Sequence, residues 1–206
     1  IAVPRTPALS NFDKLRALAD EPGVVLRYID NAREVHGADL VILAGSRATR
    51  SDLAWLGEHG FDAALGERAA RGEPILGLCG GCQALAESIH DEQGVEGAPG
   101  VTPGLGLLPI TVHFEHEKRV SRVSGVGRHP LLGAGPLGGY LMHHGRVRPA
   151  REGVLPALVL DGGEPDGAQA GSVLGSMVHG LLDHAGTRHA LLRWLRPGGP
   201  WQAATV

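Results

Sequence analysis

Two cysteines, Cys79 and Cys82, stand three positions apart in the run PILGLCGGCQALAES, and they are the only cysteines among 206 residues. This C-x-x-C spacing is compatible with three kinds of chemistry: a redox-active dithiol, half of a metal site, or one reactive thiol beside an inert one. A redox role is disfavoured because the Gly80-Gly81 pair gives the turn little rigidity and no thioredoxin-like pattern surrounds it.

A metal site would need two further ligands at a suitable spacing. The chain offers His113 with His116, and His143 with His144. Because the sequence holds eleven histidines, pairs of this kind arise by coincidence. We therefore expect no metal site.

The run GLCGG around Cys79 has the G-x-C-x-G pattern of a nucleophile elbow, a tight turn between a strand and a helix. Such a turn strains the backbone at its apex and requires small neighbours, which Gly77 and Gly81 provide. We expect the helix N-terminus to lower the pKa of the Cys79 thiol, and the Gly80 N–H to stabilise an oxyanion. Cys82 would lie one turn into the helix as a small buried residue. A plain structural turn is less favoured, because it does not require glycine on both sides.

A thiol nucleophile needs a base, and histidine is the usual one. His179 ends the apolar run VLGSMVHG beside a glycine, where a strand would deliver it over the cysteine. His143 and His144 lie in a similar setting, LMHHGR, so the spacing favours His179 only slightly. Four other histidines have positions that indicate exposure to solvent: His36, His59, His90 and His189.

Glycines and prolines divide the chain into the elements that must position these residues. We expect strands at residues 24–29, 38–46, 75–78, 110–114, 139–147, 155–160 and 171–180. We expect helices at residues 10–20, where Ser10 would be the N-cap, and at 51–59, 66–71, 83–89 and 183–195. This order predicts an α/β fold with a doubly wound, mostly parallel sheet flanked by helices and extra strands in the second half. Ligands bind at the carboxyl ends of such strands, where Gly45 and Cys79 fall.

Composition excludes several classes of protein. A net charge of −3, with 43% hydrophobic and 20% charged residues, gives no basis for binding nucleic acid or a membrane surface through bulk charge. No apolar run is long enough to cross a membrane, and two cysteines make no disulfide framework, so we expect a cytoplasmic protein. The length favours one domain over residues 1–206, and the start at Ile1 indicates a piece of a longer protein.

The run GLCGGCQAL resembles the nucleophile segment of class I glutamine amidotransferases, in which a G-x-C-x-G-x-Q pattern carries the catalytic cysteine. More narrowly, the chain is similar to amidotransferase domains of the cobyric acid synthase type. Four further stretches carry this resemblance in the family's order and extend it over nearly the whole chain: PRTPALSNFDKL, DLVILAGSRATRSDLAWL, GGYLMHHGRV and GSMVHGLLD.

The resemblance implies a flavodoxin-like fold and a glutaminase in which Cys79 attacks the side-chain amide of glutamine. His179 would take the thiol proton and pass it to the departing ammonia. The implied oxyanion hole consists of Gly45 and Gly80. The implied substrate contacts are Gln83, Ser46 and His143.

Three positions depart from the pattern of the wider class. Many class I enzymes carry a Glu two residues after the catalytic His, whereas this chain has Leu181 at that position. The cobyric acid synthase subgroup also lacks this Glu, so the difference fits the narrower resemblance. Asp183 is then the remaining guess for the group that orients His179. Arg47 replaces the usual Lys of a P-G-S-K loop, and Leu141 replaces the usual Glu after Gly-Tyr. The thiol and the imidazole are both retained.

The family's complete enzymes join this domain to an ATP-dependent synthetase that amidates corrin carboxylates in cobalamin biosynthesis. The sequence has no G-x-x-x-x-G-K-[ST] loop, so we expect no cofactor here and assign ATP and magnesium to the missing synthetase domain. The expected partners are glutamine and that synthetase, with no nucleic acid and no membrane. Three alternatives stay open: the glutaminase subunit of an enzyme amidating cell-wall lipid II, a cysteine-dependent α/β hydrolase using Asp161 or Asp166, and a non-catalytic binding module.

Overall fold

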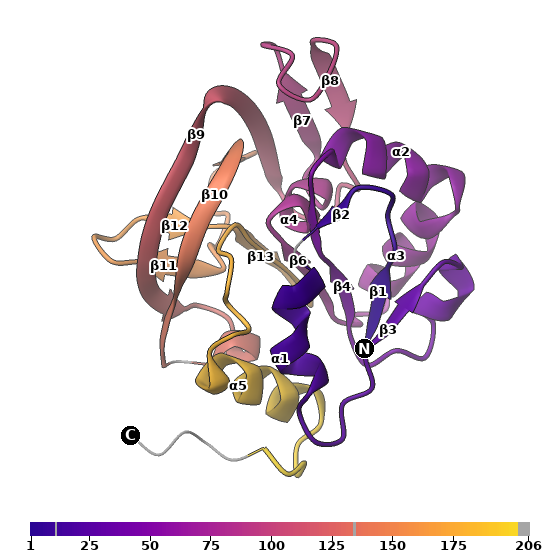
Figure 1. Ribbon diagram of the computed structural model, residues 1–206, viewed down its shortest axis with the longest axis vertical. Coiled ribbons are helices and arrows are strands. Elements are labelled where there is room, and N and C mark those ends of the chain that lie inside the picture. The colour runs from indigo at the N-terminus through magenta and orange to yellow at the C-terminus, as the bar shows by residue number, and fades with distance from the viewer. Residues whose placement is uncertain (11, 134, 202–206) are drawn as a thin grey trace.

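The computed structural model describes residues 1–10, 12–133 and 135–201, and within them a six-stranded main sheet lies beside a second sheet (Figure 1). The strands of the main sheet are parallel except for the edge strand β13. The middle of the sheet is buried, because β4 and β6 are apolar on both faces. Across the sheet the order is β13 (Ala168–Ala170), β14 (Val173–Ser176), β6 (Ile75–Leu78), β4 (Val41–Leu43), β1 (Ala2–Pro4) and β3 (Arg27–Ile29).

Helices α1 to α4 lie between strands in the chain and α5 follows the last strand; the longer helices bury one face against the core. In α2, for example, Leu53 and Leu56 are buried on one face. α1 and α5 lie next to each other (Figure 1), and Arg188 of α5 donates to Glu21 after α1 at 2.9 Å. The α-helices are α1 (Arg16–Ala19), α2 (Thr49–Glu58), α3 (Phe61–Ala70), α4 (Gly80–Ala84) and α5 (Ala185–Leu195). The 3-10 helices are η1 (Phe12–Leu15), η2 (Ala32–Val35) and η3 (Pro130–Leu132).

The second sheet is built around a long antiparallel pair, β9 and β10, which stands beside the main sheet (Figure 1). Two backbone hydrogen bonds tie this pair to the loop after β14: Tyr140 N–H donates to the His179 carbonyl at 3.0 Å, and His179 N–H donates back at 2.8 Å. The strands are β7 (Ser88–Asp91), β8 (Gly100–Pro103), β9 (Ile110–Gly127), β10 (Pro136–Pro149), β11 (Leu158–Leu160) and β12 (Pro165–Asp166). A separate two-stranded ladder joins β2 (Leu9–Ser10) to β5 (Gly45–Ser46).

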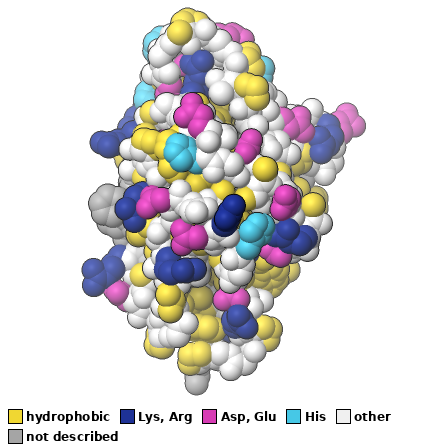
Figure 2. Space-filling view, turned by 90° about the vertical axis from the view of Figure 1, so that its right-hand side faces the viewer, with side chains coloured by type: hydrophobic (Ala, Val, Ile, Leu, Met, Phe, Trp, Pro, Cys, Tyr) yellow, Lys and Arg dark blue, Asp and Glu magenta, His cyan; other side chains and the backbone are white. Residues whose placement is uncertain are grey.

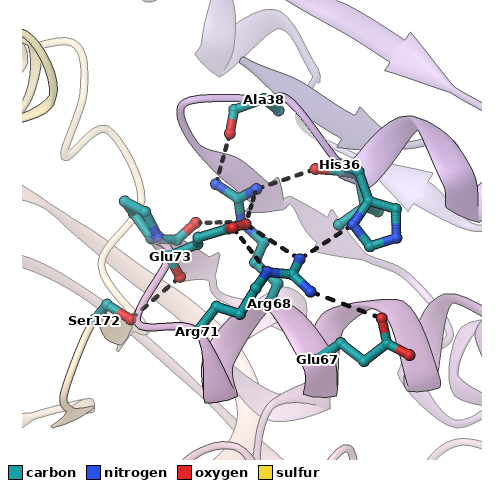
Figure 3. A network of polar contacts seen from close by, with 9 residues as sticks. His36, Ala38, Glu67, Arg68, Arg71, Glu73 and Ser172 are labelled. Atoms are coloured by element: carbon teal, nitrogen blue, oxygen red, sulfur yellow. Dashed lines mark hydrogen bonds and ion pairs between the residues drawn. The ribbon is translucent and has the colours of Figure 1, made fainter.

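A buried arginine holds the loops at the amino ends of β4 and β6 (Figure 3). Arg68 of α3 is 1% exposed and donates to the carbonyls of Val35, Ala38 and Pro74 at 3.0, 2.8 and 3.0 Å. Its remaining charge is balanced by Glu73 at 3.1 Å. Burial lowers the pKa of Arg68, and the nearby Glu73 carboxylate opposes this effect.

The surface mixes charges of both signs. On the face shown in Figure 2, acidic and basic side chains are interspersed, which agrees with a net charge of −3. Among the described helices, none is long and apolar enough to span a membrane.

The structure confirms the predicted doubly wound, mostly parallel sheet with extra strands in the second half. The strand predicted at residues 75–78 has the observed bounds of β6. The helices predicted at residues 51–59, 66–71 and 183–195 correspond to α2, α3 and α5, with shifted ends.

Two predicted helices are wrong in part. The helix at residues 83–89 ends with α4 at Ala84, because the chain turns there and enters β7 at Ser88. Ser10 is not an N-cap, since it lies in β2, and the next residue, Asn11, is outside the described residues. The strand expected at 110–114 is much longer, because β9 continues to Gly127.

Candidate active site

Cys79 forms the turn between β6 and α4 and has a strained backbone. Its φ is 51° and its ψ is −109°, and it is the only non-glycine residue with a positive φ in the described part of the chain. Such a conformation costs on the order of 1–3 kcal/mol and persists only where the surroundings hold it. Here the Cys79 N–H donates to the Ser176 carbonyl on β14 at 2.8 Å. The geometry is that of a nucleophile elbow.

The glycines around Cys79 allow α4 to pack against the sheet. A Cβ atom on Gly81 would lie 1.9 Å from the carbonyl oxygen of Leu43 on β4. A Cβ atom on Gly77 would lie 2.8 Å from the backbone nitrogen of Cys82. Both distances are far below van der Waals contact, so the elbow requires glycine at these two positions.

The Cys79 thiol is buried, and it is not already ionised to a thiolate. Only 8% of the residue is exposed, and burial raises the pKa of the thiol to about 12, although a hydrogen bond from the Gly80 N–H opposes this effect. The Gly80 N–H at the start of α4 lowers the pKa of the thiol as expected, but the expected net lowering is wrong, because desolvation outweighs this donor. The thiol therefore stays protonated at neutral pH until a base removes its proton.

His179 lies in the loop after β14 and lines the same cavities as Cys79. It is 7% exposed, and its Nε2 atom is buried without a hydrogen-bond partner. Burial is the largest cause that lowers the pKa of His179, so the imidazole is neutral at pH 7. His179 and Cys79 share these cavities, but no hydrogen bond joins the ring to the thiol among the described residues. A neutral imidazole with an unpartnered nitrogen is the form of histidine that accepts a proton.

The second sheet orients the His179 ring. The ring stacks on Tyr140 of β10, with centroids 5.1 Å apart and an angle of 10° between the planes. A hydrogen bond with the Met142 backbone raises the pKa of His179 and partly offsets burial. Within the described residues, no hydrogen bond or ion pair joins the Asp183 side chain to His179, so the backbone and an aromatic ring take the place of an orienting acid.

A cavity of about 290 Å³ opens over the thiol. Five of the residues predicted for the site line it: Ser46, Cys79, Gln83, His143 and His179. Gly45 lines a narrower cleft of about 30 Å³ that also contains Cys79 and His179. Gly80 packs against the same loop, since a Cβ atom there would lie 2.5 Å from the Ser46 backbone nitrogen. The structure thus gathers all seven predicted residues at the carboxyl ends of β4, β6 and β14.

Gln83 projects from α4 into the cavity and is fixed at one end. Thr49 of α2 donates to its Oε1 atom at 3.0 Å, and the residue is 4% exposed. A Cβ atom on Gly145 of β10 would lie 2.5 Å from Gln83 Nε2, so this glycine leaves room for the amide. The amide of Gln83 therefore reaches the cavity with its rotamer fixed by contacts from α2 and β10.

The Ser46 hydroxyl holds its own loop. It donates to Asp52 Oδ2 at 2.6 Å and accepts from the Ala48 N–H at 3.0 Å. Asp52 also accepts from the Thr6 hydroxyl and the Ala8 N–H, at 2.8 and 2.9 Å. Asp52 is 3% exposed and was not predicted from the sequence, where an Asp in the first turn of a helix is the only signal.

A buried acid under the elbow was also not predicted as part of this site. Asp166 of β12 accepts from the Ser176 hydroxyl at 2.6 Å and from the Met177 N–H at 3.2 Å. Burial raises the pKa of Asp166 to about 6. Asp166 supports the loop between β14 and His179, and its distance in the sequence from Cys79 hides its place in this site.

Cys82 is a free thiol with no exposed surface, and it packs on Gly175 of β14. Burial raises its pKa well above the usual value. Throughout the described residues, no three His, Cys, Asp or Glu side chains gather in a way that could hold a metal ion.

Solved structures define the class of the fold. A crystal structure of a glutamine amidotransferase superposes with a TM-score of 0.67 at 21% identity, covering 94% of this chain and 96% of that one. The structure of PurLQS from Thermotoga maritima superposes with a TM-score of 0.70 at 17% identity, covering 95% of this chain and 98% of that one. The fold is that of the class I glutamine amidotransferases.

Sequence comparison narrows this class to one family. Residues 1–187 match the model of the CobB/CobQ-like glutamine amidotransferase domain, and the chain belongs to this family. The cobyric acid synthase of Sorangium cellulosum is 42% identical over 218 residues, which cover 95% of this chain and 42% of that protein. The cobyric acid synthase of Streptomyces avermitilis is 43% identical over 197 residues, covering 94% and 35%. The chain therefore spans only about two fifths of these curated relatives, and the resemblance drawn from the sequence is confirmed.

Proposed function

We propose that this chain hydrolyses glutamine to glutamate and ammonia through a thioester on Cys79. One observation carries the proposal: the strained elbow thiol and the unpartnered Nε2 of His179 line one cavity in a glutamine amidotransferase fold. A protonated thiol and a neutral imidazole are the protonation states that the first step requires.

In the first step, His179 Nε2 takes the proton of the Cys79 thiol while the sulfur attacks the side-chain carbonyl carbon of glutamine. A C–S bond forms, and the carbonyl electron pair moves to the oxygen. The Gly80 N–H and the Gly45 loop are the proposed donors to this oxyanion. The imidazolium then gives its proton to the amide nitrogen, the C–N bond breaks, and ammonia leaves a glutamyl thioester.

In the second step, His179 takes a proton from a water molecule that attacks the thioester carbonyl. The C–S bond breaks, glutamate forms, and the proton returns to sulfur. In this scheme Gln83, Ser46 and His143 form the wall that holds the substrate. Asp161 and Asp166, the acids that a cysteine hydrolase would use, contact Ser124 and Ser176 instead of His179.

The ammonia is proposed to serve an amidation. The named relatives are cobyric acid synthases more than twice as long as this chain. We therefore propose that residues 1–206 form the glutaminase domain of a longer cytoplasmic synthase, and that an ATP- and magnesium-dependent synthetase part amidates corrin carboxylates. No cofactor is proposed for the chain itself.

The nucleophile is tested with 6-diazo-5-oxo-L-norleucine, an electrophilic glutamine analogue, followed by mass spectrometry. We expect one adduct on the wild-type chain, one on Cys82→Ser and none on Cys79→Ser. Cys82→Ser is the matched control, because it removes the neighbouring thiol. Equal labelling of both variants would show that the assignment of the nucleophile is wrong.

A further inference from the structure

His143 has a buried nitrogen that nothing in the protein satisfies. The residue sits on β10 at an irregularity of the β9–β10 pairing, where the register shifts between His143 and Gly145. It is 7% exposed and lines the catalytic cavity with Cys79 and His179. Its Nε2 atom is buried and has no hydrogen-bond partner. A buried polar atom left unpaired is costly, so its occupant should be sought in the cavity.

The other ring nitrogen determines what Nε2 is able to do. Nδ1 of His143 lies 2.7 Å from the carbonyl oxygen of Gly145. A carbonyl oxygen only accepts, so Nδ1 carries the hydrogen and Nε2 of the neutral ring presents a lone pair. Burial and the positive charges of Arg146 and Arg119 lower the pKa of His143 to about 4, which keeps this ring neutral at pH 7. Nε2 of His143 is therefore a hydrogen-bond acceptor that has no donor within the described residues.

The substrate and the product of the proposed reaction differ at the group that faces this cavity. The side chain of glutamine ends in an amide with two N–H donors, whereas that of glutamate ends in a carboxylate with acceptors only. A lone pair in a buried cavity attracts the amide and repels the carboxylate. The discrimination therefore follows from the tautomer that the Gly145 carbonyl imposes.

We propose that Nε2 of His143 accepts a hydrogen bond from the side-chain amide N–H of bound glutamine, and so makes His143 the residue that selects the amide over the acid. This inference rests on the proposed glutaminase function. His143 is a specificity-determining residue in this scheme, distinct from the base His179. It positions the amide nitrogen, which is the leaving group, and weakens the hold on glutamate once the thioester has been hydrolysed.

A rival occupant of Nε2 is a water molecule on the other side of the ring. His143 also lines a second cavity of about 250 Å³ with Arg119, Arg146, Glu164 and Asp166. If Nε2 faces only that cavity, the substrate amide does not reach it. The test must therefore separate a contact with the amide from a general role in shaping the site.

The test uses protection of Cys79 against 6-diazo-5-oxo-L-norleucine, which carries no amide N–H. Two protecting ligands are compared: glutamine, and L-glutamate γ-methyl ester, which keeps the carbonyl but has no N–H on that group. Protection is measured relative to each variant's own unprotected labelling rate. For His143→Phe we expect a half-protecting glutamine concentration about tenfold higher than that of the wild type, as loss of one hydrogen bond predicts. The half-protecting ester concentration should change less than twofold.

Matched variants complete the experiment. His113→Phe is the control, because this ring stacks on His90 in the same sheet and lines neither cavity; we expect wild-type protection. His143→Gln restores an acceptor oxygen and should return glutamine protection to within threefold of the wild type. If His143→Phe does not fold, His143→Leu compared with His143→Gln answers the same question.

The inference is overturned if glutamine and ester protection shift together, or if neither shifts. It also falls if the wild-type chain is never labelled at Cys79, but that result identifies the proposed function as the error. Labelling with protection by glutamine, together with an unchanged amide preference in His143→Phe, rejects the inference alone.

Discussion

The reactivity of Cys79 depends on a balance between burial and a few backbone donors. The elbow places the sulfur at the start of α4, where the Gly80 N–H and, to a smaller extent, the positive charge of Lys118 lower the pKa of the thiol. Desolvation dominates because the residue is 8% exposed. A resting thiolate is therefore not expected, and in the proposed reaction the nucleophile forms only when His179 removes the proton in the presence of substrate.

This balance predicts how simple alkylation depends on pH. A thiol with a pKa of about 12 has a thiolate fraction that grows about tenfold for each pH unit below that value. Alkylation of Cys79 by iodoacetamide should therefore accelerate about tenfold per unit from pH 7 to pH 9, without levelling off. Peptide mapping by mass spectrometry separates Cys79 from Cys82. A plateau near pH 7 would contradict the raised pKa and restore a resting thiolate.

Single residues were predicted from the sequence where one short motif defines the chemistry. The elbow pattern predicts Cys79 and its glycines, whereas the apolar run that ends in His-Gly favours His179 only slightly over His143, and the resemblance to the family decided between them. Asp52, Tyr140 and Asp166 were missed as supports of the site. Asp52 binds both the nearby Ser46 and the distant Thr6, Tyr140 stacks on the distant His179, and Asp166 accepts a hydrogen bond from Ser176. No sequence motif marks any of these contacts.

At the scale of elements, the close approach of α4 to β4 decides whether the elbow forms. Gly81 lies directly against the Leu43 carbonyl. That carbonyl belongs to the backbone of a central strand, which has no freedom to move aside. The elbow is therefore specified by the packing of a helix on a strand as much as by its own turn.

Replacement of Gly81 by Ala should destabilise the protein by about 3 kcal/mol, because the new methyl would overlap a backbone oxygen. Gly66→Ala on α3 is the matched control, since its Cβ atom would meet nothing within 4 Å. That variant should gain about 0.5–1 kcal/mol from helix propensity. Chemical denaturation measures both changes. A Gly81→Ala protein as stable as the wild type would disprove the packing argument.

Helices and strands were predictable from the sequence where the apolar pattern is compatible with only one type of element. Ile75–Leu78 is apolar and bounded by Pro74 and the elbow, so β6 was predicted with its observed ends. The stretch QALAESI fits a helix, but its second half pairs with β8 and β9 as a strand. The charged middle of β9 looks like a loop in the sequence, and only its pairing with β10 makes it a strand.

At the scale of the whole molecule, the two ends of β6 have separate tasks. The carboxyl end carries Cys79, and the amino end is held by the Arg68 network in Figure 3. The network joins α3 to the loops before β4 and β6, and its members approach neither cavity that contains the thiol. Stability and catalysis should therefore respond to different substitutions.

Arg68→Met should lower the free energy of unfolding by about 3 kcal/mol or more, because one buried and two partly buried carbonyls lose their donor. The rate of glutamine hydrolysis per folded molecule should stay within twofold of the wild type. Arg33→Met, at an exposed position, is the control and should change stability by less than about 0.5 kcal/mol. Thermal unfolding and glutamate release measure the two quantities. A large loss of rate in folded Arg68→Met would show that the two ends of β6 are coupled.

The pair of backbone hydrogen bonds between Tyr140 and His179 has a mechanical consequence. His179, the proposed base, follows a strand of the main sheet, yet a strand of the second sheet sets the orientation of its imidazole ring. A molecule that binds the outer part of the β9–β10 pair would therefore change proton transfer by His179 from a distance, without entering the cavity in which the proposed reaction takes place.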